Sequence, residues 1–323
     1  MNNLMSVKKL DIGKFIKSQG ALIAFLLLFI AASIKYDQFL SFLNLSNVLR
    51  QVSMIGLVGI GMTFVILIGG IDLSVGAVVA VAGVLAANLS STNSLILTIF
   101  VPILAATFLG FVNGFVVTKM KIVPFIATLA MMMGARGIAY ITTGEVSVRV
   151  GQISPTFTAL ARGYILGLPV PAVIFVFTIL AAAFISKYTT LGRHIYAVGG
   201  NEEAARMMGL KVDRIKMTAY TICSALAGFA GVILTARLGA GQPVAGEGWE
   251  MNAIAAVVLG GTQLTGGVGK FGGTFIGVLI IGIITNIFNM QGNINTWWQN
   301  VIMGALLLVV VVIQSQAAKS KKV

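Results

Sequence analysis

The sequence predicts an all-α polytopic membrane protein with about ten transmembrane spans, and three observations support this fold class. The chain has 323 residues, of which 58% are hydrophobic and only 10% are charged, whereas about a quarter of the residues in a soluble domain are charged. The mean hydropathy is +0.99. The apolar runs are continuous rather than alternating and reach the length of a membrane helix, which excludes a transmembrane β-barrel.

A bilayer core requires about 20 apolar residues per helix, and this length divides the chain into ten predicted spans. They lie near residues 20–36, 48–68, 72–90, 95–117, 122–142, 165–186, 217–236, 251–261, 271–289 and 297–313. The eighth span is short, and glycine-rich turns interrupt the helical pattern at two places. We expect one transmembrane domain over residues 20–313, with a segment before it (1–19) and a tail after it (314–323).

The first span follows a lysine-rich start, a pattern that also resembles a signal peptide. Lys8, Lys9, Lys14 and Lys17 precede an apolar run at 21–34, in which Ala-Ala-Ser at 31–33 resembles a cleavage site. Because so many spans follow, we favour an uncleaved first span.

The basic residues predict the orientation of the spans. The formal net charge is +13, but the lysines and arginines cluster in short connections between apolar runs, so we expect them to set orientation rather than to bind nucleic acid. In the ten-span topology, 16 basic residues fall in cytosolic segments and five in outer segments. Cytosolic chain ends follow from this count, whereas nine spans would put the basic C-terminus outside.

The segment 187–216 is the most polar part of the chain and holds nine of its 31 charged residues. We expect it to be a cytosolic loop that contains a short helix. Asn201 is the predicted N-cap, Glu202 and Glu203 suit the positive end of the helix, and Gly209 ends it. Ala204, Met207 and Met208 would form a small apolar face. A solvated loop with one chance helical turn is the alternative.

Two glycine-rich turns share the pattern Gly-Gly-x-x-Leu-Ser/Thr-x-Gly, at 69–76 and 260–267. Glycine interruptions at corresponding places in two halves of a carrier point to a transport path. A chance match is an equal alternative in a chain with 38 glycines. Both turns would lie on the cytosolic side, so a repeat would be parallel.

Residues for catalysis or metal binding are scarce. No phosphate-binding loop with the Gly-x-x-x-x-Gly-Lys-Ser/Thr pattern occurs, and the chain has a single cysteine, Cys223, and a single histidine, His194. We therefore expect no ATPase site, no disulfide within the chain, no metal and no cofactor. The energy for any ATP-driven process would come from another chain.

Polar residues within the spans are candidates for a translocation path. Asp72 caps the third span in the simpler interpretation and lines a path in the other. Arg136 either pairs or faces water inside its span, or extends toward the outer surface. Neutral groups could meet an uncharged polyhydroxyl solute, although hydrogen bonds between helices explain most of them equally well: Asn88, Asn113, Thr128, Asn252, Thr285, Asn286, Asn289 and Asn300. The tentative path set is Asp72, Thr128, Arg136, Asn252 and Asn286.

Several stretches together resemble the membrane permease subunit of bacterial ABC importers for ribose and related monosaccharides. They are GMTFVIL at 61–67 with GGIDLSVG at 69–76, PFIATL at 124–129, GRHIYAVGGNEEAA at 192–205 and WEMNAIAAVVLGG at 249–261. In such importers a cytosolic Glu-Ala-Ala-x-x-x-Gly loop docks into the ATPase, and EAARMMG at 203–209 matches it. The Leu-Pro that ends the longer motif is absent.

The resemblance implies a function, partners and a location. The chain would be a permease subunit in the bacterial inner membrane that forms the path for ribose or a related sugar. Its partners would be a second permease copy, a cytosolic ATPase and an extracytoplasmic sugar-binding protein. The implied coupling residues are Gly192, Asn201, Glu202, Glu203, Ala204, Ala205, Met208 and Gly209.

Three alternatives stay open on the sequence. A permease for branched-chain amino acids would share most of these motifs. An ion-coupled carrier working alone is disfavoured because carboxylates are scarce within the spans. A membrane scaffold would leave the glycine-broken spans unexplained.

Overall fold

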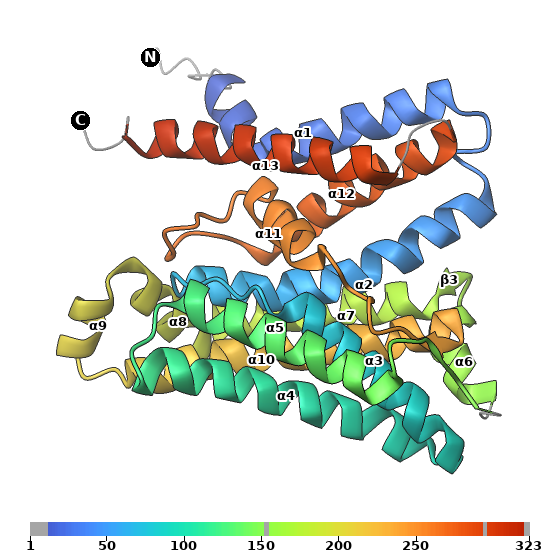
Figure 1. Cartoon of the computed structure of the whole chain (residues 1–323). Coiled ribbons are helices and arrows are strands. Elements are labelled where there is room, and N and C mark those ends of the chain that lie inside the picture. Colours follow the sequence, from blue (N-terminus) through green and yellow to red (C-terminus); the bar gives the residue numbers. More distant parts are fainter. Residues whose placement is uncertain (1–11, 152–154, 293–295, 320–323) are drawn as a thin grey trace.

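The computed structural model describes residues 12–151, 155–292 and 296–319, and these are helical over most of their length (Figure 1). The elements are α1 (Ile12–Lys35), α2 (Phe42–Leu67), α3 (Val75–Leu89), the 3-10 helix η1 (Ser90–Thr92), α4 (Leu95–Lys119), α5 (Pro124–Thr143), β1 (Val148–Arg149), α6 (Pro155–Arg162), β2 (Tyr164–Ile165), β3 (Leu168–Pro169), α7 (Val170–Tyr188), α8 (Thr190–Gly200), α9 (Glu202–Met207), α10 (Val212–Leu238), β4 (Ala240–Gly241), α11 (Trp249–Leu259), α12 (Phe271–Gln291) and α13 (Thr296–Lys319). β1 pairs with β4, and β2 pairs with β3, both antiparallel.

Each of the ten predicted spans coincides with a helix, which confirms the all-α polytopic fold class. Seven helices in the described residues are long and apolar enough to cross a membrane: α2, α3 with η1, α4, α5, α7, α10 and α12. Shorter apolar stretches occupy Gln19–Lys35, Trp249–Leu259 and Trp298–Val309. The number of helices that cross the membrane stays a prediction, as does the division into segments, whose ends 1–11 and 320–323 lie outside the described residues.

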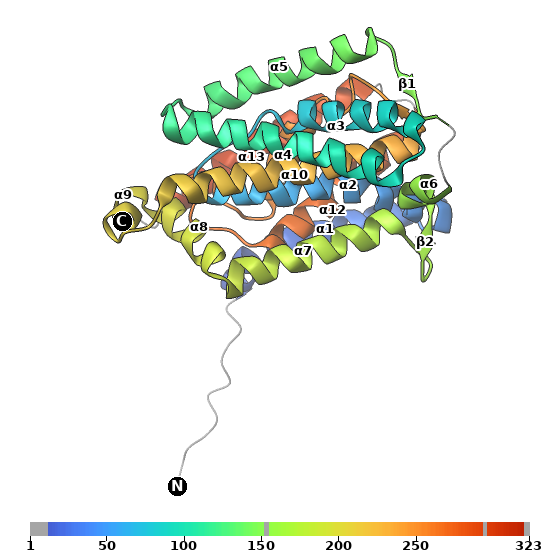
Figure 2. The same cartoon turned by 90° about the horizontal axis from the view of Figure 1, so that it is seen from below.

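Helix α2 runs through the middle of the molecule (Figures 1 and 2), and every residue from 52 to 67 in it is buried. Small residues let its neighbours come close. A Cβ on Gly61 of α2 would lie 2.7 Å from the Cα of Cys223 in α10, and one on Gly114 of α4 would lie 2.7 Å from the Cα of Met217. Close backbone approach of this kind is how membrane helices gain packing energy without a hydrophobic driving force.

The two ends of the helical bundle differ in composition. Helices α8 and α9 lie at one end, together with the start of α1 and the end of α13, whereas α6 and the β2–β3 hairpin lie at the opposite end (Figures 1 and 2). The segments that the charge distribution assigns to the cytosol therefore gather at one end of the fold.

One local prediction was wrong, and one helix was not predicted. The sixth span was expected from residue 165, but Tyr164 to Pro169 form the β2–β3 hairpin and α7 begins only at Val170. Leu166 and Gly167 both have positive φ in its turn, which a count of apolar residues does not detect. The polar segment 187–216 also contains a second helix, α8, which was not predicted.

Candidate functional site

The short helix predicted in the polar segment is present as α9. Asn201 precedes it in an extended conformation, and its Oδ1 accepts a hydrogen bond from the backbone N–H of Ala204 at 3.0 Å. Glu202 and Glu203 occupy the first turn, where carboxylates are favoured by the helix dipole. The helix ends at Met207, and Gly209 has a φ of +83° that favours glycine.

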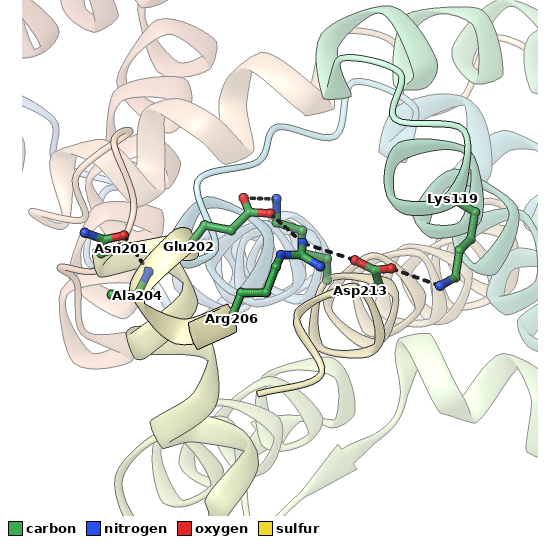
Figure 3. A network of polar contacts seen from close by, with 7 residues as sticks. Lys119, Asn201, Glu202, Ala204, Arg206 and Asp213 are labelled. Carbon is green, nitrogen blue, oxygen red and sulfur yellow. Dashed lines mark hydrogen bonds and ion pairs between the residues drawn. The ribbon is translucent and has the colours of Figure 1, made fainter. Parts of the chain in front are cut away.

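A network of charged side chains holds α9 against α10 and α4 (Figure 3). Glu202 accepts hydrogen bonds from Arg206 at 3.2 Å and from Lys216 of α10. Asp213, in the first turn of α10, pairs with Arg206 at 3.4 Å and with Lys119, the last residue of α4, at 2.9 Å. Because α9 has only six residues, it needs such contacts to stay helical.

The charge network also lowers the pKa of the Glu202 carboxyl group. Partial burial raises the pKa of this carboxyl group, but hydrogen bonds and positive charge from Lys216 and Arg206 outweigh burial, and the net pKa is lowered. Glu202 therefore stays ionised at neutral pH, and its ion pairs persist there.

One side of α9 faces the protein and the other side is free. Ala205 is completely buried, whereas Met207 and Met208 are 88% and 71% exposed. Exposed methionines are adaptable apolar contacts of the kind found at binding surfaces. The buried side fixes the helix, and the exposed side is available to another protein.

Helix α8 is packed backbone to backbone against both glycine-rich turns, an arrangement that the sequence did not reveal. A Cβ on Gly199 would lie 1.7 Å from the carbonyl oxygen of Leu67 at the end of α2. That same oxygen accepts a hydrogen bond from the N–H of Gly267 at 2.9 Å, and the Tyr196 hydroxyl donates to the Gly269 carbonyl at 2.8 Å. The turns at 69–76 and 260–267 also contact each other and α8, since a Cβ on Gly266 would lie 2.8 Å from the Gly69 nitrogen and 3.0 Å from the Gly199 carbonyl oxygen.

Asp72 is completely buried within the first glycine-rich turn, and its side chain bonds the backbone at the start of α3 although Asp72 does not occupy the N-cap position. The N-cap position of α3 belongs to Ser74. Asp72 Oδ1 instead accepts from the backbone N–H of Ser74 at 2.9 Å and from its hydroxyl at 2.6 Å, and Asn113 donates to that hydroxyl at 2.9 Å. The Thr128 hydroxyl lies against the same turn, 3.5 Å from the Ile71 carbonyl.

Arg136 is tolerated in the middle of α5 because backbone carbonyls meet its charge. Its Nη1 donates to the carbonyl oxygens of Pro243 at 2.6 Å and of Ala245 at 2.8 Å. These carbonyls belong to the turns between β4 and α11, and Arg136 satisfies them where the helical hydrogen-bond pattern is absent. Arg136 thus ties α5 to the start of α11.

The two path candidates that carry amides have different surroundings. Asn286 of α12 exchanges hydrogen bonds with Asn44 of α2, at 2.8 and 3.2 Å, so it joins two helices. Asn252, in the first turn of α11, lines two cavities. The five path candidates therefore occupy three places: the turn with Asp72 and Thr128, the α11 region with Arg136 and Asn252, and the Asn44–Asn286 pair.

Comparison with known proteins identifies the family. A family model described as "Branched-chain amino acid transport system / permease component" matches residues 44–311. The ribose import permease protein RbsC of Bacillus subtilis (strain 168) is 42% identical over 307 residues, 95% of each chain. RbsC of Haemophilus influenzae (strain ATCC 51907 / DSM 11121 / KW20 / Rd) is 41% identical over 315 residues, 97% of each chain.

A second sugar permease is nearly as similar. The L-arabinose transport system permease protein AraH of Escherichia coli (strain K12) is 38% identical over 311 residues, 96% of this chain and 94% of AraH. No solved structure matches the chain significantly. The matches over nearly the whole length confirm the resemblance, and the chain belongs to the family described as the permease component of branched-chain amino acid transport systems.

Proposed function

We propose that this chain is the permease subunit of an ATP-driven ABC importer and forms the translocation path for a monosaccharide, ribose or a related sugar. The relatives at 38–42% identity carry the names of ribose and L-arabinose permeases and align over at least 94% of both chains. The family description refers to branched-chain amino acids, but no relative considered above is named for an amino acid.

The observation that carries the coupling proposal is that α9 is buried on one side and exposed on the other. Its inner side is fixed by the buried Ala205 and by the charge network, and its outer side presents Met207 and Met208. A cytosolic ATPase that binds this outer side would move α9, α10 and α4 together, because Glu202 and Asp213 tie these helices to one another. The proposed coupling set is Gly192, Asn201, Glu202, Glu203, Ala204, Ala205, Met208 and Gly209.

The proposed assembly contains two permease copies, two ATPase domains inside and a sugar-binding protein outside, in a bacterial inner membrane with both chain ends cytosolic. ATP would favour one state of the ATPase pair, and the permease would follow because its two transport states bind the ATPase differently. The chain itself would hydrolyse nothing.

The double variant Met207→Glu/Met208→Glu tests the docking surface. Both side chains are exposed, so we expect normal amounts of permease in the membrane. Because two carboxylates would remove the apolar contact, ATPase co-purification and ATP-driven sugar uptake should each fall at least about tenfold. The matched control Met207→Leu/Met208→Leu keeps the apolar surface and should retain both. Wild-type uptake in the glutamate variant would contradict the docking proposal.

The solute class is tested separately with the wild-type importer reconstituted with its ATPase and binding protein. We expect ATP-dependent uptake of labelled D-ribose or L-arabinose and none of L-leucine. Leucine uptake would establish the amino acid alternative, and sugar uptake driven by a proton or sodium gradient without the ATPase would establish an ion-coupled carrier.

A further inference from the structure

Two adjoining cavities lie beside α11, between α2, α12 and α13. The first, of about 230 Å³, has polar side chains from all four helices and from the segment before α11: Gln51, Glu247, Asn252, Thr285, Gln299 and Asn300. The second, of about 280 Å³, shares Asn252, Asn300 and Met303 with the first and continues along α13 to Leu307.

The polar lining is unusual for a protein with these apolar helices. A third cavity, of about 210 Å³ between α7 and α12, is lined only by apolar residues such as Val176, Leu180 and Phe275. Gln51 and Asn252 are half-buried and Asn300 is exposed, so their amide groups are accessible to a solute. Within the part of the chain that the structure describes, no hydrogen bond engages the side chains of Gln51, Asn252 or Asn300.

Aromatic side chains also line the first cavity. Trp249 and Phe288 border the first cavity together with its amides, the Thr285 hydroxyl and the Glu247 carboxylate. Ligand sites combine apolar or aromatic walls with a few polar groups that fix orientation. Here the polar groups both donate and accept, and the aromatic rings offer flat apolar faces, so the set suits a neutral solute with several hydroxyl groups.

The first cavity has room for a small solute. Its volume of about 230 Å³ is enough for a single monosaccharide.

The two cavities follow one another along α13. The first borders Gln299, Asn300 and Met303, near the start of the helix, and the second borders Asn300 to Leu307, farther along it. Helix α13 runs toward the end of the molecule where α8 and α9 lie (Figure 1). Asn252 and Asn300 stand at the junction, with access to both cavities.

We propose that these cavities form successive binding positions for one monosaccharide, and that Asn252 and Asn300 hold its hydroxyl groups at the junction between them. The inference rests on the proposed function as a sugar permease and assigns the solute contacts within it. Arg136 acts as a positioning residue, because its bonds to the Pro243 and Ala245 carbonyls fix the segment that presents Glu247 and Trp249.

Cysteine protection in the assembled importer tests the site directly. Cys223 is the only cysteine of the chain and is buried, so background labelling is low. The variants are Asn252→Cys and Asn300→Cys, with Asn88→Cys as the matched control. Asn88 is a half-buried amide of α3 that lines neither cavity. Each is treated with a small thiosulfonate reagent during ATP turnover, in the presence of the ATPase and the binding protein.

We expect the reagent to modify the Asn252→Cys and Asn300→Cys variants and to block their uptake. Saturating D-ribose or L-arabinose should slow modification at least about fivefold, whereas L-leucine should not, because bound sugar covers the junction. Sugar should leave the modification rate of Asn88→Cys unchanged. Modification rates that do not change with sugar in both junction variants would overturn the site, and so would the absence of modification in both.

The isosteric variants Asn252→Leu and Asn300→Leu provide a second readout. They preserve shape but remove hydrogen bonding, so the maximal uptake rate should fall about tenfold while ATPase co-purification stays at the wild-type level. The Asn88→Leu variant should transport normally. Wild-type uptake in both junction variants would overturn the inference, whereas a wild-type importer that takes up no sugar would overturn the proposed function instead.

Discussion

Single glycines decide how closely the polar end of this protein packs. Gly199 and Gly200 are neighbours at the end of α8, yet their surroundings differ completely. A Cβ on Gly199 would collide with the Leu67 carbonyl oxygen and the Gly267 nitrogen, at 1.7 and 2.5 Å, whereas a Cβ on Gly200 would meet no atom within 4 Å. The Gly-Gly pair is visible in the sequence, but which of the two glycines has no room for a side chain depends on Leu67 and Gly267, which are distant in the chain.

The substitution Gly199→Ala should therefore destabilise the protein, and Gly200→Ala should not. The backbone atoms around Gly199 cannot move without shifting α2 or the 260–267 turn, and overpacking of this kind costs about 1–3 kcal/mol. We expect a lower thermal unfolding midpoint for purified Gly199→Ala in detergent and a wild-type midpoint for Gly200→Ala. Equal midpoints for both variants would show that α8 does not pack as described.

The buried polar residues show the limit of inference from sequence at this scale. Asp72 and Arg136 were both recognisable as charged groups at membrane depth. Asp72 is bonded by Ser74, two residues along the chain, whereas Arg136 donates to the carbonyls of Pro243 and Ala245, which are distant in the chain. The partner of Asp72 is local and could be expected from the sequence, whereas the distant partners of Arg136 could not.

At the scale of elements, apolar length predicted the long helices well because a membrane imposes that length on any span. Capping residues likewise predicted α9, since Asn201, Glu202 and Gly209 act locally. Helices α6 and α8 and the β2–β3 hairpin were missed. They are short pieces at the ends of the bundle, where no bilayer sets a length and packing against neighbours determines the conformation.

The ion pairs that hold α9 against α10 should weaken at acidic pH and stay unchanged at neutral pH. Because the pKa of Glu202 is lowered on folding, its ion pairs stabilise the protein fully above the ordinary carboxyl value of about 4.3 and are lost as pH falls through the lower folded value. The difference in unfolding midpoint between wild type and Glu202→Gln should be constant from about pH 8 to 5.5 and should decrease as the pH falls below the ordinary carboxyl value of about 4.3.

The difference in stability between wild type and Glu202→Gln should be small. The Glu202 and Arg206 side chains are 42% and 56% exposed, and pairs this exposed contribute about 0.2–1 kcal/mol. Glu203→Gln is the matched control, because Glu203 is exposed and has no ion pair within the described residues. A pH dependence that is equal in the two variants would contradict the role given to the Glu202 pairs.

At the scale of the whole molecule, the fold places the charged segments at one end and the hairpin turn at the other (Figures 1 and 2). Leu166, at the tip of that turn, is 99% exposed, and Met207 in α9 is 88% exposed. In the proposed orientation Leu166 faces the exterior and Met207 faces the cytosol.

A membrane-impermeant maleimide should therefore label Leu166→Cys in intact spheroplasts and label Met207→Cys only in inside-out vesicles. The wild-type chain, whose Cys223 is buried, is the unlabelled control for both preparations. Labelling of Met207→Cys in intact spheroplasts would reverse the orientation.

The short length of α11 affects how this helix enters the membrane. With 11 residues it is about 16 Å long, roughly half the hydrocarbon thickness, so a translocon cannot retain it as an independent span. The chain before it is held by Arg136 of α5, which binds the Pro243 and Ala245 carbonyls, and by Gly241, which fits against the Gly83 carbonyl of α3. We therefore expect α11 to fold onto α3 and α5 after these helices are in place, rather than to insert as a separate segment.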